Sequence, residues 1–112
     1  MSPELKTMKC IPCEGGVPPL SDNDENRLMI QVSGWEVLRQ GTHQLRRLFQ
    51  FKDFKLAMNF VNKIADVAES EQHHPDLHIF FNRVEVVLYT HAINGLTEND
   101  FIMAAKINAL PE

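Results

Sequence analysis

Residues 69–100 read ESEQHHPDLHIFFNRVEVVLYTHAINGLTEND, and this stretch decides the fold. It contains the end of one predicted helix, a predicted β-hairpin and the start of another helix. It also holds four of the five histidines of the chain. Proline disfavours helical geometry at the residue before it, so Pro75 predicts that the helix entering this stretch ends near residues 70–72.

The hairpin is predicted from two runs that follow this proline. Residues 77–81 form the first strand candidate, and residues 84–89 alternate as a half-buried strand does. If residues 82 and 83 make the turn, opposed residues have numbers that sum to 165. His74 then lies opposite His91, and His73 joins the same edge. The pattern therefore predicts a histidine cluster.

A predicted helix lies on each side of the hairpin in the sequence. Thr97 and Asp100 form a predicted capping box before the apolar run 101–110. The long helix before the hairpin begins after Asp53, and its core face is predicted to carry Phe54, Ala57, Met58, Val61, Ile64, Ala65 and Ala68. A second apolar line on this helix indicates either a wide core face or an oligomer contact: Leu56, Phe60 and Val67.

The amino-terminal part completes the element order. Residues 1–20 are rich in proline and glycine and are predicted to form an extended arm without regular elements. Ser21 caps a predicted helix over 22–32, and residues 35–39 and 45–51 are strand candidates. The order α-β-β-α-β-β-α predicts an α+β domain over 21–112, with a four-stranded antiparallel sheet and three helices on one face.

The composition is that of one globular domain. The chain has 112 residues, of which 44% are apolar and 23% are charged. A net charge of −4 disfavours nucleic-acid binding, which needs a basic surface. The sequence lacks an apolar run of the roughly 20 residues that a membrane span needs, and its first residues lack the apolar core of a secretion signal. We therefore expect a cytosolic protein.

Two cysteines occur as Cys10-Ile-Pro-Cys13. The pair could be half of a zinc site, but a second ligand pair at suitable spacing is missing from the sequence. It could be a redox pair, although the βαβ pattern that usually accompanies one is absent. The interpretation we favour is two reduced thiols in the arm.

The histidine cluster suits acid/base chemistry. Histidine titrates near neutrality, so one ring can accept a proton while a neighbouring ring donates one. Asp100 would lie near the cluster, although its place in the capping box is by itself a structural role. A metal site is a second interpretation, and a chance grouping of surface histidines is a third. His43 and His78 are predicted to be incidental.

The residues of this stretch resemble the signature of the pterin-4a-carbinolamine dehydratases, also called 4a-hydroxytetrahydrobiopterin dehydratases. The matching positions are Glu69, His73-His74-Pro75, Phe81-Asn82, Thr90-His91, Gly95-Leu96-Thr97 and Asp100. Gly34-Trp35 and residues 49–54 also match, and residues 13–20 resemble the arm of bacterial members. The resemblance covers nearly the whole chain.

The resemblance implies elimination of water from a 4a-hydroxytetrahydropterin to give quinonoid dihydropterin, within the recycling of tetrahydrobiopterin. It implies neither a metal nor an organic cofactor. His73, His74 and His91 would be catalytic, with His74 favoured as the base and His91 or His73 as the acid. The supporting and substrate-binding residues would be Glu69, Asp100, Thr90 and Pro75.

The implied partners are a pterin substrate, a second or further copies of the chain in a homodimer or homotetramer, and a functional link to an aromatic amino-acid hydroxylase. Two positions depart from the family pattern, because Leu77 replaces an aromatic residue and Phe81 replaces a tyrosine. The alternative function is a non-catalytic dimerisation or assembly protein on the same fold. The three histidines favour the enzyme.

Overall fold

The computed structural model describes residues 4–11 and 17–111. Its elements are η1 (Leu5–Thr7), α1 (Asp22–Met29), β1 (Glu36–Leu38), β2 (Gln44–Gln50), α2 (Phe54–Glu71), β3 (Asp76–Phe80), β4 (Arg83–Leu88) and α3 (Glu98–Asn108). The predicted order of three helices and four strands is confirmed. The short 3-10 helix η1 lies in the arm, where we expected no regular element. The boundary between arm and domain at residue 20 stays a prediction.

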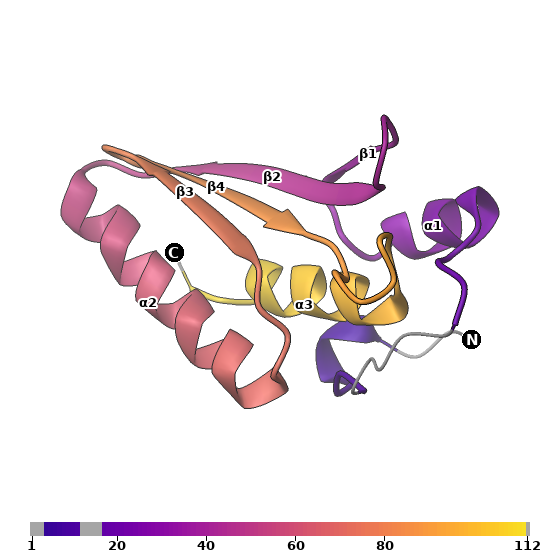
Figure 1. Ribbon diagram of the computed structural model, residues 1–112. Helices are drawn as coiled ribbons and strands as arrows, with labels where there is room; N and C mark the ends of the chain where they lie inside the picture. Colours follow the sequence, from indigo (N-terminus) through magenta and orange to yellow (C-terminus); the bar gives the residue numbers. More distant parts are fainter. Residues whose placement is uncertain (1–3, 12–16, 112) are drawn as a thin grey trace.

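The four strands form one antiparallel sheet in the order β1-β2-β4-β3. The three α-helices lie on one face of this sheet, as Figure 1 shows, and none of the described helices covers the other face. The described part of the chain contains no helix that is both long and apolar enough to cross a membrane. The α+β architecture predicted from the pattern of elements is therefore the observed one.

The core fills the space between the sheet and the helices. Alternate residues of β2 and β4 point inward and are buried: Leu45, Phe49, Val84, Val86 and Leu88. Helix α3 lies at the centre of the molecule, and nearly all of its side chains are buried. Its remaining side contacts η1, whose Leu5 is 2% exposed. The arm thus contributes a core residue and covers one side of a helix whose residues are mostly buried.

Helix α2 begins and ends where the sequence predicted. The side chain of Asp53 accepts a hydrogen bond from the backbone N–H of Leu56, and the last helical residue is Glu71. Its buried line consists of Ala57, Phe60, Ile64 and Ala68. The prediction was therefore wrong for two positions of the core face, Phe54 and Ala65, which are exposed. On the second apolar line, Phe60 is buried, which agrees at that position with the wide core face and not with an oligomer contact. Phe60 belongs to the core because its ring packs on those of Phe49 and Phe51.

The predicted register of the hairpin was wrong by two residues. Strands β3 and β4 pair with Asp76 opposite Val87 and Phe80 opposite Arg83, so paired numbers sum to 163. The turn is formed by Phe81, which has a φ of 50°, and Asn82. The side-chain amide of Asn82 donates to the backbone carbonyl of Phe51, and the backbone carbonyl of Asn82 accepts from the Phe51 N–H. These two bonds fix the turn beside the start of α2. His74 and His91 therefore lie outside the ladder and are not paired across it.

Candidate active site

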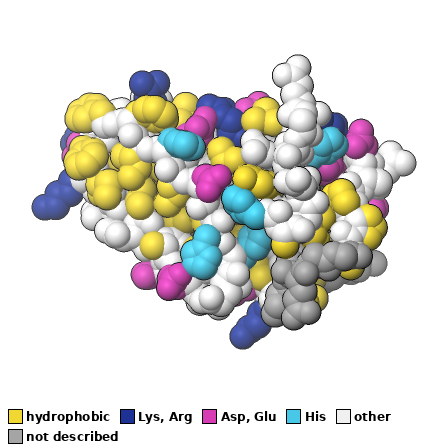
Figure 2. Space-filling view, in the orientation of Figure 1, with side chains coloured by type: hydrophobic (Ala, Val, Ile, Leu, Met, Phe, Trp, Pro, Cys, Tyr) yellow, Lys and Arg dark blue, Asp and Glu magenta, His cyan; other side chains and the backbone are white. Residues whose placement is uncertain are grey.

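A cleft of about 680 Å³ lies where the end of α2, the start of β3, the end of β4, the start of α3 and the arm meet. Its volume falls within the range of about 300–1,000 Å³ that is usual for small-molecule sites. All three predicted catalytic histidines line it, together with the predicted Pro75 and Thr90. Figure 2 shows histidine side chains gathered near the middle of this face of the molecule. The fold therefore brings the three histidines into one cleft without the cross-strand pairing that we expected.

The chain reverses at the end of α2 and directs two histidines into the cleft. Gln72 has a left-handed backbone conformation with a φ of 54°, and its N–H donates to the carbonyl of Ala68. The N–H of His73 bonds the same carbonyl. Such a left-handed residue commonly ends a helix, although glycine is the usual choice. It separates the helix from the extended segment that carries His73, His74 and Pro75.

His73 is held by a buried carboxylate. Its Nε2 lies 2.7 Å from Oδ1 of Asp100, and the two side chains are 12% and 0% exposed. The other carboxylate oxygen of Asp100 accepts from the Thr90 hydroxyl at 2.9 Å and from the Thr97 N–H at 3.0 Å. The predicted capping box is thus present, and Asp100 serves the helix end and His73 together. An ionised Asp100 fixes the His73 tautomer with the proton on Nε2, which leaves Nδ1 able to accept one.

His74 has its own carboxylate partner at the surface. Its Nε2 lies 2.5 Å from Oε2 of Glu69, two residues before the end of α2, and the two side chains are 55% and 72% exposed. An ion pair this exposed contributes little to stability, because water screens it. Its effect is orientation, since the contact through Nε2 leaves Nδ1 as the ring nitrogen able to exchange a proton.

His91 lines the same cleft from the loop that follows β4, three residues after Leu88. Its ring packs on that of Tyr89, with the ring centroids 4.1 Å apart. The loop that carries it is closed by a bridge between Thr90 and Gly95, in which the Thr90 N–H donates to the Gly95 carbonyl at 2.9 Å. Thr90 lines the cleft but is only 4% exposed, and its hydroxyl donates to Asp100. The hydroxyl also contacts that of Thr97, and the expected substrate contact of Thr90, through its backbone or hydroxyl, stays a prediction.

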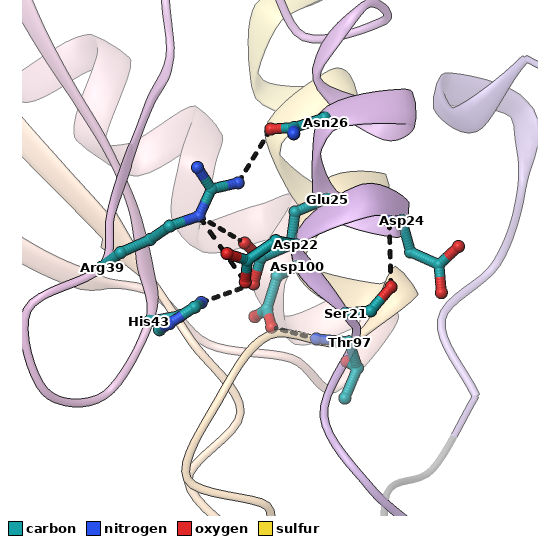
Figure 3. A network of polar contacts seen from close by, with 9 residues as sticks. All are labelled: Ser21, Asp22, Asp24, Glu25, Asn26, Arg39, His43, Thr97 and Asp100. Carbon is teal, nitrogen blue, oxygen red and sulfur yellow. Dashed lines mark hydrogen bonds and ion pairs between the residues drawn. The ribbon is translucent and has the colours of Figure 1, made fainter.

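His43, which we predicted to be incidental, takes part in a second polar cluster. Its Nδ1 lies 2.8 Å from the buried carboxylate of Glu25, and Arg39 bonds the other oxygen of Glu25 at 2.9 Å (Figure 3). Glu25, His43 and Asp22 are close enough to share a metal ion, and they form the one such group found among residues 4–11 and 17–111. The Arg39 guanidinium already neutralises Glu25, so this cluster has a structural explanation: it fastens α1 to the β1–β2 hairpin.

Several residues of the cleft were missed in the sequence. Tyr89 was assigned to the half-buried strand, and Glu71 and Asn99 were not singled out. Cys10 and Ile11 of the arm also line the cleft. The CxxC pattern drew attention to the arm but gave no sign of its place beside the histidines. Cys13 lies outside the described residues.

A family model described as pterin 4 alpha carbinolamine dehydratase matches residues 18–110. The chain belongs to the pterin-4-alpha-carbinolamine dehydratase family. This is a family of hydro-lyases, and the match covers most of the chain. The family resemblance noted in the sequence is thereby confirmed.

Individual relatives match along most of the chain. A candidate pterin-4-alpha-carbinolamine dehydratase of Rubrobacter xylanophilus is 47% identical over 96% of this chain and 98% of its own length. The mitochondrial pterin-4-alpha-carbinolamine dehydratase 2 of Arabidopsis thaliana is 44% identical over 96% of this chain and 59% of its own. A solved transcriptional coactivator/pterin dehydratase from Brucella melitensis has a TM-score of 0.76 and 38% identity over 81% of this chain and 96% of its own.

A further solved structure shares the fold alone. It is a pterin dehydratase-like protein described as a RuBisCO assembly factor in the alpha-carboxysome, with a TM-score of 0.58 and 19% identity over 68% of this chain and 87% of its own. The same fold therefore occurs in a protein described as an assembly factor.

Proposed function

We propose that this protein is a 4a-hydroxytetrahydropterin dehydratase in which His73, His74 and His91 carry out acid/base catalysis. The observation that carries the proposal is the joint placement of these three histidines in one cleft, two of them bonded to carboxylates. Membership of the dehydratase family supplies the substrate class. The cleft has room for a bicyclic pterin.

The reaction needs one proton donor and one acceptor. The C4a–O bond breaks, the departing hydroxyl takes up a proton and leaves as water, and a ring N–H of the pterin gives up a proton as the new double bond forms. Imidazoles suit both steps because each can be an acid or a base near neutral pH. His74 is the proposed base, and His73 or His91 is the proposed acid.

The carboxylates orient these rings. Asp100 fixes the position of His73 because its fully buried carboxylate accepts a hydrogen bond from Nε2 of the ring, and it stabilises the positive charge of the ring when His73 is protonated. Glu69 orients His74 in the same way from an exposed position. Pro75 disfavours helical geometry at His74, the residue before it, and so helps to keep the extended segment out of the helix.

The proposed setting is the recycling of tetrahydrobiopterin, in which an aromatic amino-acid hydroxylase makes the substrate. The expectation of a cytosolic protein stays a prediction. A non-catalytic assembly function on the same fold is the alternative, and the bonded histidines favour the enzyme because a scaffold has no need of them.

Turnover tests the proposal directly. The 4a-hydroxypterin is generated in situ by an aromatic amino-acid hydroxylase, and formation of the quinonoid dihydropterin is followed by absorbance. We expect the protein to accelerate this step above the spontaneous rate. A rate equal to the spontaneous one at micromolar protein would reject the proposed function and leave the assembly alternative.

We also propose that the protein is at least a homodimer. Exposed apolar rings gather where the β3–β4 turn meets the start of α2, with Phe54 at 50%, Phe80 at 51% and Phe81 at 71% exposure. Figure 2 shows a large apolar area at one end of the molecule. Strand β3 is also an edge strand, whose outer backbone groups can pair with another strand. A second copy of this chain would cover both features.

A further inference from the structure

The arm supplies one wall of the cleft. Cys10 and Ile11 line it beside His73 and His91, although they lie about sixty residues or more away along the chain. Ile11 lines the cleft and is 69% exposed, so its aliphatic side chain is open to contact by a ligand in the cleft. Such a side chain is positioned to cover an apolar ring face that enters the cleft.

Asn99 holds this wall in place by a reciprocal pair of hydrogen bonds. The Ile11 N–H donates to Oδ1 of Asn99 at 2.9 Å, and the Asn99 amide donates back to the Ile11 carbonyl at 2.5 Å. The thiol of Cys10 donates to the Asn99 backbone carbonyl at 3.7 Å. Asn99 is 6% exposed, so these bonds are shielded from water and the arm is fixed in one register.

Glu71 makes a second attachment one residue earlier in the arm. Its Oε1 accepts from the Cys10 N–H at 2.8 Å, and its other oxygen lies 3.8 Å from the Lys106 ammonium. The side chains of Glu71 and Lys106 are 11% and 18% exposed. The carboxylate is therefore held between the arm and α3 and cannot turn into the cleft without losing both contacts.

The two attachments lie next to the proposed catalytic residues in sequence. Asn99 precedes Asp100 at the start of α3, and Glu71 is the last residue of α2, two positions before His73. The helix ends that position His73 and Asp100 therefore also position the arm. A shift of either helix end would move the wall and the proposed catalytic groups together.

We propose that the Cys10–Ile11 segment is a substrate-contacting wall of the pterin cleft, and that Asn99 and Glu71 are positioning residues that set pterin affinity without taking part in proton transfer. Ile11 covers one face of the bound ring, and its main-chain bonds to Asn99 fix the width of the cleft. This inference rests on the proposed function.

Two variants test the side chain of the wall, Ile11, and its attachment through Asn99 independently. Ile11→Asp keeps the backbone bonds to Asn99 and replaces an exposed side chain, so folding is unaffected. Asn99→Ala removes both side-chain bonds to Ile11. For each variant we expect a roughly tenfold rise in KM and in the Kd for 7,8-dihydrobiopterin measured by calorimetry, with kcat within about twofold of wild type. Thermal unfolding is recorded beside these values to show that Asn99→Ala is folded.

Matched controls lie elsewhere in the arm. Val17→Asp places the same carboxylate at an arm position that is 57% exposed and does not line the cleft. Gln31→Ala removes the bond from the Leu5 N–H to Gln31 and loosens the start of the arm. Both controls should keep the wild-type KM and Kd.

The outcomes distinguish this inference from the proposed function. If wild-type protein dehydrates the carbinolamine but both cleft variants keep its KM and Kd, the wall is not part of the site. If Gln31→Ala weakens binding as much as Asn99→Ala, general loosening of the arm explains the effect and the inference is wrong. If wild-type protein neither binds nor dehydrates the pterin, the proposed function fails and this inference falls with it.

Discussion

His73 and Asp100 form a buried imidazole–carboxylate pair, with Nε2 of the ring 2.7 Å from Oδ1 of the carboxylate. Bonds from Thr90 and Thr97 to the other oxygen prevent the carboxylate from turning. One aspartate thus caps α3 and orients a proposed catalytic ring. This double role explains how a capping-box residue, which has a structural function in any helix, can also belong to the site.

Asp100→Asn should reduce kcat by about 100-fold or more, within the usual range for losing an oriented acid or base. An amide can present its NH2 group to His73 Nε2, which would force the proton onto Nδ1 and give the wrong tautomer. The coupled dehydration assay measures this. Glu98→Gln, which changes an exposed acid in the same first turn, serves as the control and should keep full activity. Wild-type kcat in Asp100→Asn would contradict the proposed orientation.

His74→Ala should reduce the catalysed rate by at least about 100-fold while leaving the unfolding midpoint unchanged. The ring is 55% exposed and its ion pair with Glu69 is screened, so its removal leaves no buried group unpaired. Kinetics and thermal unfolding are compared on the same preparation. His78→Ala is the matched control, because His78 is an exposed strand residue outside the cleft. Equal rates in the two variants would remove His74 from the mechanism.

The thiol of Cys10 should resist alkylation in the folded protein. Burial, followed by the neighbouring Glu71 carboxylate, raises its pKa from 9.0 to about 12. In a Cys13→Ser background, iodoacetamide at pH 8 should label native protein far more slowly than protein in urea, since the thiolate is the reactive form. Glu71→Gln should increase the labelling rate of native protein, but not as far as the rate in urea. Equally fast labelling in the native state and in urea would show that the raised pKa is wrong.

The same pKa difference predicts a pH dependence of stability. The folded protein retains the Cys10 proton over a pH range, from about 9 to about 12, in which the unfolded chain loses it. The contribution of this group to the free energy of unfolding is therefore complete below pH 9 and is lost as the pH rises toward 12. Denaturant titrations at pH 8 and pH 10.5 check this, with Cys10→Ala showing the smaller decrease. An identical decrease in both proteins would contradict it.

Phe60→Ala should lower the free energy of unfolding by about 3–5 kcal/mol, because it removes a buried ring and leaves a cavity. Phe60 is 2% exposed and packs against Phe49 and Phe51 at centroid distances of 4.8 and 5.1 Å. Urea denaturation measures the loss. Leu56→Ala, on the same helix but 43% exposed, should change stability by less than about 0.5 kcal/mol. A small effect of Phe60→Ala would contradict its place in the core.

Light scattering should show a mass of at least twice 12.8 kDa. A second copy would cover the exposed rings near the β3–β4 turn, so Phe80→Glu should shift the protein toward the monomer. Ile30→Glu, at an exposed apolar position that follows α1, should leave the mass unchanged. Wild-type protein found entirely as a 12.8 kDa species would reject the homodimer.

Much of the fold could be predicted because its signals are local. Asp53 and Thr97 mark helix starts, Pro75 requires the long helix to end, and alternation in residues 84–88 marks a strand. The turn of the β3–β4 hairpin could not be placed in this way. Phe81 has a positive φ that a bulky residue rarely adopts, and it does so because Asn82 bonds the backbone of Phe51, thirty-one residues away.

The candidate site was likewise predictable only where its signals are local. The histidines were recognised as a group, but the geometry first used to join them, a cross-strand pair of His74 and His91, was wrong. They share a cleft because a left-handed Gln72 ends α2 and because the Thr90–Gly95 bridge closes the loop after β4. Backbone reversals of this kind depend on contacts between segments and have weak sequence signals.

The sequence by itself determined the order of elements, the helix ends around residues 69–100 and the residue types able to move protons, because caps, breakers and side-chain chemistry act over a few residues. The tertiary structure decided which of these residues meet. It buried Asp100 against His73, placed Phe60 of the second apolar line in the core, and brought Cys10 and Ile11 to the cleft. These contacts join segments far apart in the chain, and their register depends on packing that local pattern does not encode.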